Sequence, residues 1–154
     1  MTRRLTPSNL AVAILAWIML AACGQVALTE EEIFQRGLQN EEEGDLRAAL
    51  IDYKNTLQVN PAHLEARLRL ALASLDLGDI ETARAELTRA ENLGAEPSAV
   101  MIPMARIWLM DGENSRVLDE LNPETLAPDD AATRAEMLLL RGEALAALAR
   151  EEEA

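Results

Sequence analysis

The sequence predicts an all-α fold, an antiparallel array of about three and a half helix pairs. A glycine followed by an acidic residue recurs every 34 residues, at Gly44-Asp45, Gly78-Asp79 and Gly112-Glu113, and such a period is typical of stacked helix-turn-helix units. Of the 154 residues, 49% are hydrophobic but only 3% aromatic, which favours helices packed through small side chains. No long run alternates apolar and polar residues, so no sheet is expected.

The charge of the chain excludes one class of partner. The formal net charge is −13, and residues 1–22 contain two basic residues and no acidic one, which leaves −15 on the remainder. Such a surface repels phosphate backbones, so we expect no nucleic-acid partner. We interpret the acidity as keeping a helical protein soluble outside the cytoplasm.

The N-terminus has the features of a secretory signal. Arg3 and Arg4 precede an entirely apolar run over residues 10–22, which is too short to span a bilayer but suits the hydrophobic part of a signal peptide. Small residues then precede Cys23, the single cysteine of the chain, so no intrachain disulfide can form. We expect residues 1–22 to be the signal peptide.

The surroundings of Cys23 resemble the bacterial lipobox, in which the cysteine is acylated and becomes the first mature residue. The resemblance implies a lipid anchor on Cys23 and a tether over residues 23–29, and two or more acyl chains anchor stably. Gly24 stands where many inner-membrane lipoproteins carry aspartate, which points to the periplasmic face of the outer membrane. The alternative is an ordinary cleaved signal peptide with an incidental cysteine.

The first helix pair is predicted over residues 30–63. Thr29 and Glu32 form a capping-box pattern that starts a helix ending near residue 43. The second helix follows the Gly44-Asp45 turn and stops at Asn60-Pro61, with small and apolar residues at helical spacing. Arg36 and Asn40 occupy positions where an inner unit would carry apolar contacts, so we interpret them as the exposed side of a terminal unit.

The second pair, residues 64–97, is the most regular. Pro61 is expected to start its first helix, Asp79 to cap its second and Gly94 to end it. His63, the only histidine, has no cysteine or aspartate nearby in the sequence and is predicted to be a surface residue, not a ligand.

The third and fourth pairs depart from this pattern. In residues 98–129, Pro103 should delay or kink the first helix, the second helix over 114–121 is short, and an irregular linker over 122–129 follows. Residues 130–154 hold one helix, over about 130–148, without the partner that the period predicts. We therefore expect a fragment of a longer array, cut within a partial fourth unit. The alternative is that residues 149–154 are the frayed tail of a small complete protein.

The spacing of small and apolar residues resembles the tetratricopeptide (TPR) repeat. Its pattern places Gly or Ala in the first helix, Ala and a large residue in the second, and Pro at the end. The first unit matches loosely at Ile33, Gly37, Ala49, Tyr53 and Pro61, and the next two carry small and apolar residues at the same offsets. The resemblance implies a TPR solenoid that binds a protein or peptide along the concave side of its first helices.

By that resemblance, a set of first-helix positions would line the concave groove. The predicted partner-binding residues are Phe34, Leu38, Glu65, Leu68, Leu72, Leu75, Asp76, Ile102, Arg106, Leu109 and Met110. An apolar strip with one cation, Arg106, suits a bound peptide or helix. The alternative is that any one of these leucines belongs to the core of its own repeat.

The order of segments over residues 10–154 resembles the N-terminal part of the TPR-repeat lipoproteins of the PEP-CTERM/exosortase system. A lipobox is followed by Gly-Asp-Leu-Arg-Ala-Ala from Gly44, then by Lys-Asn-Thr-Leu-Gln-Val-Asn-Pro from Lys54. The resemblance implies an outer-membrane scaffold linked to exopolysaccharide production or protein sorting. The alternative is a TPR lipoprotein that assists pilus or outer-membrane assembly.

An enzymatic function is not expected. Beyond the anchor there is one histidine and no cysteine, and the sequence contains no glycine-rich phosphate loop and no set of metal ligands. The carboxylates are scattered over predicted solvent-facing positions, so no catalytic pair can be chosen. We predict no catalytic residues, no metal and no cofactor.

Overall fold

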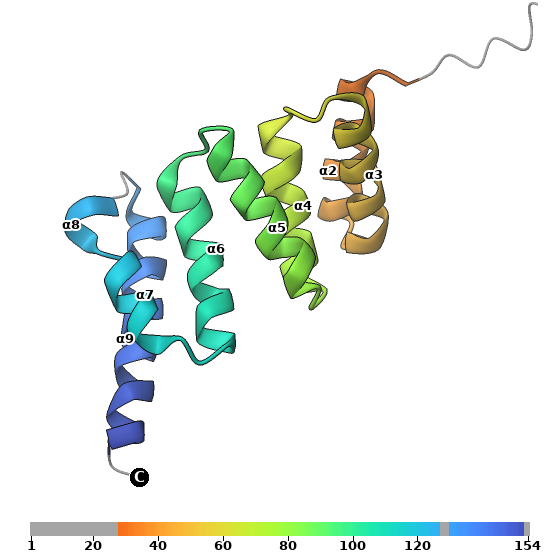
Figure 1. Ribbon diagram of the computed structural model, residues 1–154. Helices are drawn as coiled ribbons and strands as arrows, with labels where there is room; N and C mark the ends of the chain where they lie inside the picture. The colour runs from red at the N-terminus through yellow and green to blue at the C-terminus, as the bar shows by residue number, and fades with distance from the viewer. Residues whose placement is uncertain (1–27, 127–129, 153–154) are drawn as a thin grey trace, which may run out of the picture.

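The computed structural model describes residues 28–126 and 130–152, in which every regular element is a helix. The elements are α2 (Glu30–Glu42), α3 (Leu46–Val59), α4 (Leu64–Asp76), α5 (Ile80–Asn92), α6 (Pro97–Met110), α7 (Asn114–Glu120), α8 (Pro123–Leu126) and α9 (Ala131–Glu152). Figure 1 shows the helices stacked in chain order, from α2 and α3 at one end to α9 at the other. The predicted all-α helix-pair solenoid is confirmed.

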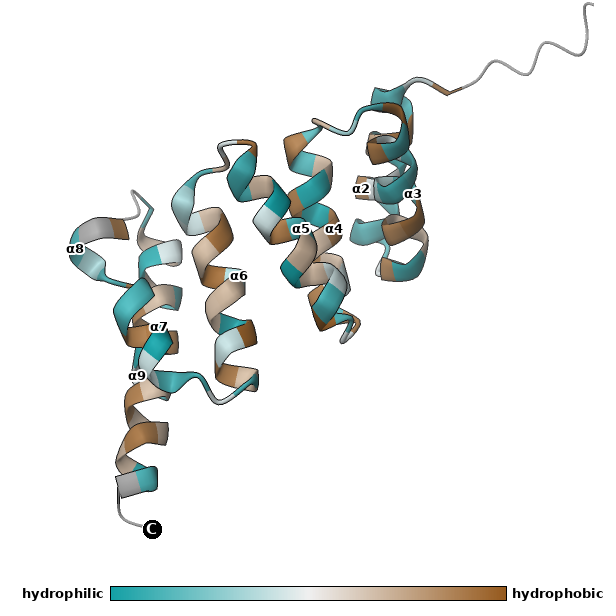
Figure 2. Ribbon diagram, in the orientation of Figure 1, coloured by the Kyte–Doolittle hydropathy of each residue, from teal (hydrophilic) through white to brown (hydrophobic). Residues whose placement is uncertain are grey.

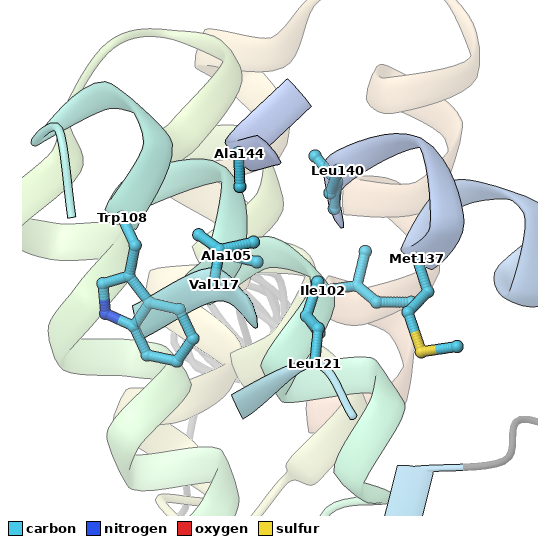
Figure 3. Packing of buried hydrophobic residues seen from close by; sticks show 8 residues of the cluster. All are labelled: Ile102, Ala105, Trp108, Val117, Leu121, Met137, Leu140 and Ala144. Carbon is cyan, nitrogen blue, oxygen red and sulfur yellow. The ribbon is translucent and has the colours of Figure 1, made fainter. Parts of the chain in front are cut away.

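The core of the solenoid is divided along the stack. Helix α3 packs on α2 and α4, α5 packs on α4 and α6, and α9 packs on α6 and α7. Three clusters of buried side chains result, one for each of these helix groups. Figure 3 shows the C-terminal cluster, where Trp108 and Ile102 of α6 meet Val117 and Leu121 from the α7 segment and Met137 of α9. Each helix pair is thus packed both internally and against its neighbours in the stack.

The turns between the two helices of each pair repeat the same backbone conformation every 34 residues. Gly44, Gly78 and Gly112 follow the first helix of each pair with φ of 82°, 80° and 76°, a left-handed conformation that favours glycine. In the first turn the amide of Asp45 donates to the carbonyl of Asn40 at 2.8 Å, and equivalent 2.8 Å bonds close the other two turns. These bonds satisfy carbonyls that the helix ends would leave unpaired.

Gly37 allows the first pair to pack closely. A Cβ added at this position would lie 2.7 Å from the Tyr53 ring and 3.3 Å from the Asp52 Cβ. Ala71 and Ala105 occupy the equivalent positions of the next two pairs and are fully covered. The small residue of the first helix therefore lies where the second helix crosses it in the first pair, and it is covered in the next two.

The last helix, α9, has one bare side. Its Met137, Leu140 and Ala144 are buried against α6 and α7. Leu139 and Leu145 on its other sides are 62% and 55% exposed, and a Cβ added at Gly142 would meet nothing within 4 Å. In the hydropathy colouring of Figure 2, hydrophobic residues run along this exposed helix. Among the described residues, no helix covers α9 as α3 covers α2.

One predicted helix start is wrong, and one of the two alternatives predicted for Pro103 is excluded. Helix α4 begins at Leu64 and not at Pro61, because His63 is the N-cap and its Nδ1 accepts the Ala66 amide at 3.2 Å. The His63 ring also lies 4.6 Å from that of Phe34, so this histidine is partly buried and not a free surface residue. Helix α6 begins at Pro97 and is continuous through Pro103, which excludes the delayed start.

Three further details differ from the sequence-based expectations. The predicted irregular linker contains the helical turn α8, and α9 extends beyond residue 148 to Glu152. Arg36 and Asn40 do not simply face solvent: both donate to the carboxylate of Asp52 on α3, at distances of 2.5 to 2.9 Å. Asp52 is only 4% exposed, and a carboxylate buried to this degree requires such partners.

Candidate functional site: the groove on the A helices

The first helices of the pairs, α2, α4, α6 and α9, are called the A helices below, and one open groove runs across them. Its volume is about 540 Å³. Its lining residues are Glu41, Glu65, Leu68, Arg69, Leu72, Asp76, Ser98, Ala99, Ile102, Pro103, Arg106, Thr133 and Glu136. Every one belongs to an A helix, so the second helices form the opposite side of the stack.

The floor of the groove is apolar and rests on the core. Leu68 and Leu72 lie one turn apart on α4, and Ile102 and Pro103 approach from α6. Ile102 is 6% exposed and packs in the C-terminal cluster against α9, as Figure 3 shows. The floor is therefore held in place by the same packing that joins α6 to α9.

One end of the groove carries a network around Arg69. The guanidinium of Arg69 lies 3.1 Å from the Glu41 carboxylate and 3.3 Å from that of Glu65. Burial alone would lower the pKa of Arg69, but the two carboxylates outweigh it and the pKa is raised. Glu41 also accepts a hydrogen bond from the Tyr53 hydroxyl. Burial, assisted by Glu41, raises the pKa of Tyr53, so its hydroxyl remains a donor at neutral pH.

The other end carries the pair between Arg106 and Glu136. The Arg106 guanidinium on α6 donates to the Glu136 carboxylate on α9 across the groove. Both side chains are more than one third exposed, so the pair contributes little to stability. The pair matters for recognition, because the cation predicted for the groove, Arg106, already has a carboxylate partner.

The structure brings together six of the eleven predicted partner-binding residues. Those on the groove lining are Glu65, Leu68, Leu72, Asp76, Ile102 and Arg106.

The other five are placed elsewhere. Phe34 and Leu75 are buried in core clusters, and Leu38 and Leu109 pack against such clusters. Met110, the last residue of α6, is 64% exposed and lies off the groove lining. A role for any of the eleven in binding a partner stays a prediction.

Several groove residues were missed by the sequence reasoning. Arg69 could have been found, because it follows Glu65 by four residues and such pairs meet on one helix face. Glu41 was not among the predicted partner-binding residues, and it reaches the groove from the last turn of α2. No sequence pattern indicated that Glu136 lies in the groove, because it meets Arg106 only through the docking of α9 after an irregular linker.

Other functional expectations concern parts of the chain outside the groove. Cys23, the predicted lipidation site, lies outside the described residues. Within residues 28–126 and 130–152, no helix is long and apolar enough to cross a bilayer. The same ranges contain no group of three or more His, Cys, Asp or Glu side chains that could hold a metal ion.

The helix pairs, the glycine turns and the groove on the A helices define a class of protein, the helical-repeat scaffolds. Residues 41–102 match the family model described as tetratricopeptide repeat. The match covers α3, α4 and α5 with parts of α2 and α6, so it includes the central part of the groove.

The match and the helix packing support a TPR protein with the fold of an all-α TPR solenoid. A search among curated proteins finds no match to the chain. TPR domains generally bind protein or peptide partners, and this fold is typical of non-catalytic scaffolds.

Proposed function

We propose that this protein is a lipid-anchored TPR scaffold that binds a protein partner at the bacterial cell envelope, in exopolysaccharide production or protein sorting linked to the PEP-CTERM/exosortase system. The observation that carries the scaffold role is the groove, because apolar side chains of two A helices form its floor and polar side chains its rim. The anchor rests on the lipobox resemblance around Cys23, and the pathway rests on the order of segments along the chain.

The groove is tested by complementation of a deletion strain in the native bacterium. Leu72→Glu places a charge on the groove floor, and Ile51→Glu places the same charge on an exposed position of α3 that is not part of the groove. We expect Leu72→Glu to abolish complementation and Ile51→Glu to preserve it, with both variants retaining the circular dichroism of the parent. Equal complementation by the two variants would refute the groove as the functional site.

The anchor is tested by metabolic labelling with a palmitate analogue. We expect label on the wild-type protein, no label on Cys23→Ser, and release of that variant from the membrane fraction. Label that persists in Cys23→Ser would contradict the lipobox prediction.

The same deletion strain separates the two pathways. Loss of exopolysaccharide or of sorted surface proteins, with normal pili, supports the proposal. The alternative, an assembly factor for pili or outer-membrane proteins, predicts loss of pili or of folded barrels with normal exopolysaccharide. This alternative rests only on the lipobox and the repeats, because assembly factors of this kind have both features.

A further inference from the structure

We propose that the groove selects a partner segment that presents a lysine or arginine beside aliphatic side chains. This inference rests on the proposed function, because it assumes that the groove is where the partner binds. It adds the chemistry of the partner, which the sequence analysis left at a peptide or helix bound to an apolar strip with one cation, Arg106.

The first argument is the balance of charge on the lining. Four carboxylates, from Glu41, Glu65, Asp76 and Glu136, face two guanidinium groups, from Arg69 and Arg106. The groove therefore carries a net charge of −2 at neutral pH. An anionic segment would be repelled, whereas a cationic one is attracted.

The second argument is that both cations of the groove already have partners. Arg69 is shared between two carboxylates at 3.1 and 3.3 Å, and Arg106 is paired with Glu136. An incoming carboxylate would have to replace these contacts. Oxygens of Glu65 and Glu136 that bind no arginine remain available as acceptors for a donor from a partner.

The third argument is Asp76, which has no hydrogen-bonding or ionic partner among the described residues. It is the last residue of α4, where the partial negative charge of the helix end disfavours a carboxylate. Asp76 is exposed to solvent, and a cation from a partner would offset this repulsion. No arginine or lysine of the described chain does so.

The wall of the groove also includes a helical turn of α6 with a missing backbone donor. Pro103 has no amide hydrogen, so the carbonyl of Ala99 lacks its usual helical donor four residues later. Ala99 and Pro103 both line the groove. The groove thus offers oxygen acceptors from side chains and backbone, which match the several N–H donors of lysine or arginine.

The apolar requirement follows from the floor. Leu68, Leu72 and Ile102 lie between the charged ends of the groove, and they gain from contact with aliphatic side chains. The volume of about 540 Å³ suits a few side chains and not a complete helix. The net charge of −15 on the chain without residues 1–22 also attracts a cationic segment at long range and raises its rate of encounter.

The test uses fluorescein-labelled peptides that share the same leucines and alanines and carry lysine, glutamine or glutamate at the remaining positions. Binding to the purified protein is measured by fluorescence anisotropy at low and high salt. We expect the lysine peptide to bind most tightly and the glutamate peptide not to bind. Salt should weaken the lysine peptide most, because partly exposed charges are screened.

Two double variants with the same change in net charge give the matched comparison. Glu65→Gln with Asp76→Asn removes carboxylates from the groove, and Asp119→Asn with Glu120→Gln removes two exposed carboxylates from α7. We expect the groove variant to weaken the lysine peptide by about fivefold, the effect of two partly exposed ion pairs, and the α7 variant to leave it unchanged. Equal weakening by both would mean attraction to the overall charge and would overturn the inference.

The failure of the inference is distinguishable from that of the proposed function. If the glutamine and lysine peptides bind equally and Leu72→Glu weakens both, the groove binds partners but does not select basic ones, and only this inference fails. If Leu72→Glu affects neither peptide binding nor complementation in the cell, the groove is not the site and both proposals fail. Circular dichroism of each variant confirms that its helices are intact.

Discussion

Replacing Gly37 and Gly142 by alanine should change stability in opposite directions, although both glycines lie inside A helices. In an isolated helix either replacement would gain about 1 kcal/mol, because alanine has the higher helix propensity. At Gly142 nothing lies within 4 Å of the added methyl group, so the whole gain should be observed.

At Gly37 the same methyl group would lie 2.7 and 2.9 Å from two atoms of the Tyr53 ring. The ring cannot easily move away, because Tyr53 is fully buried, its centroid is 5.9 Å from that of Phe34, and its hydroxyl is bonded to Glu41. Forcing an extra methyl group into such a site costs about 1–3 kcal/mol. After the propensity gain, we expect Gly37→Ala to destabilise the protein by about 1 kcal/mol.

The two variants should therefore differ by about 2 kcal/mol in the free energy of unfolding, since the two estimates have opposite signs. Urea denaturation followed by circular dichroism at the helix band measures this difference, and the denaturant slopes show whether unfolding remains one transition. Equal stabilisation by both replacements would refute the close approach of α2 and α3 at Gly37. A loss of stability in Gly142→Ala would show that another segment covers α9 in solution.

Three further predictions test the ion pairs and caps. Glu86→Ala should lower the free energy of unfolding in urea by about 3 kcal/mol, because it leaves the buried charge of Arg67, whose guanidinium lies 2.5 Å from Glu86, without a carboxylate. A loss no greater than that of the exposed control Glu91→Ala would contradict this. Hydrogen bonds from Thr82 hold the pKa of Asp79 below its usual value. The Asp79 carboxylate therefore stabilises the fold fully above the unfolded pKa of about 3.9, and this stabilisation is lost as the pH falls through the lower folded pKa. The melting temperature should fall with acid in that range, and less steeply in Asp79→Asn. Thr29→Ala should remove the capping box with Glu32 and lower stability by about 1 kcal/mol, with faster amide exchange confined to the start of α2.

The fold could be predicted because its period is carried by local chemistry. The turn at Gly44 needs a left-handed residue followed by a cap, and both requirements are visible as Gly-Asp in the sequence. The start expected at Pro61 was wrong, and the delayed start that was one of two expectations for Pro103 was excluded, for a related reason. Proline restricts a helix but does not determine where it starts, and the side chains of His63 and Glu96 accepted the capping bonds instead.

The groove could be predicted only in part, because both sides of an A helix are apolar. Phe34, Leu68 and Ile102 occupy the same position of three successive repeats. Leu68 and Ile102 line the groove, whereas Phe34 is buried against the rings of Tyr53 and His63. Periodicity gives the apolar faces of a helix but not which neighbour covers each one.

The charges were harder still to place from the sequence. The partner of Arg106 depends on how α9 docks after an irregular linker, and no local pattern encodes that geometry.

The bare side of α9 has a consequence for how the solenoid opens. In a stack where each unit is stabilised by its neighbours, the free energy of local opening decreases toward a unit that lacks one neighbour. Amide exchange should therefore be slowest in α4 and α5, which pack on helices at both sides, and fastest in the C-terminal half of α9. Thr133 and Glu136, near the start of α9, line the groove. A partner bound there would slow exchange in α9, so occupancy of the groove would be detectable as rigidity at the far end of the stack.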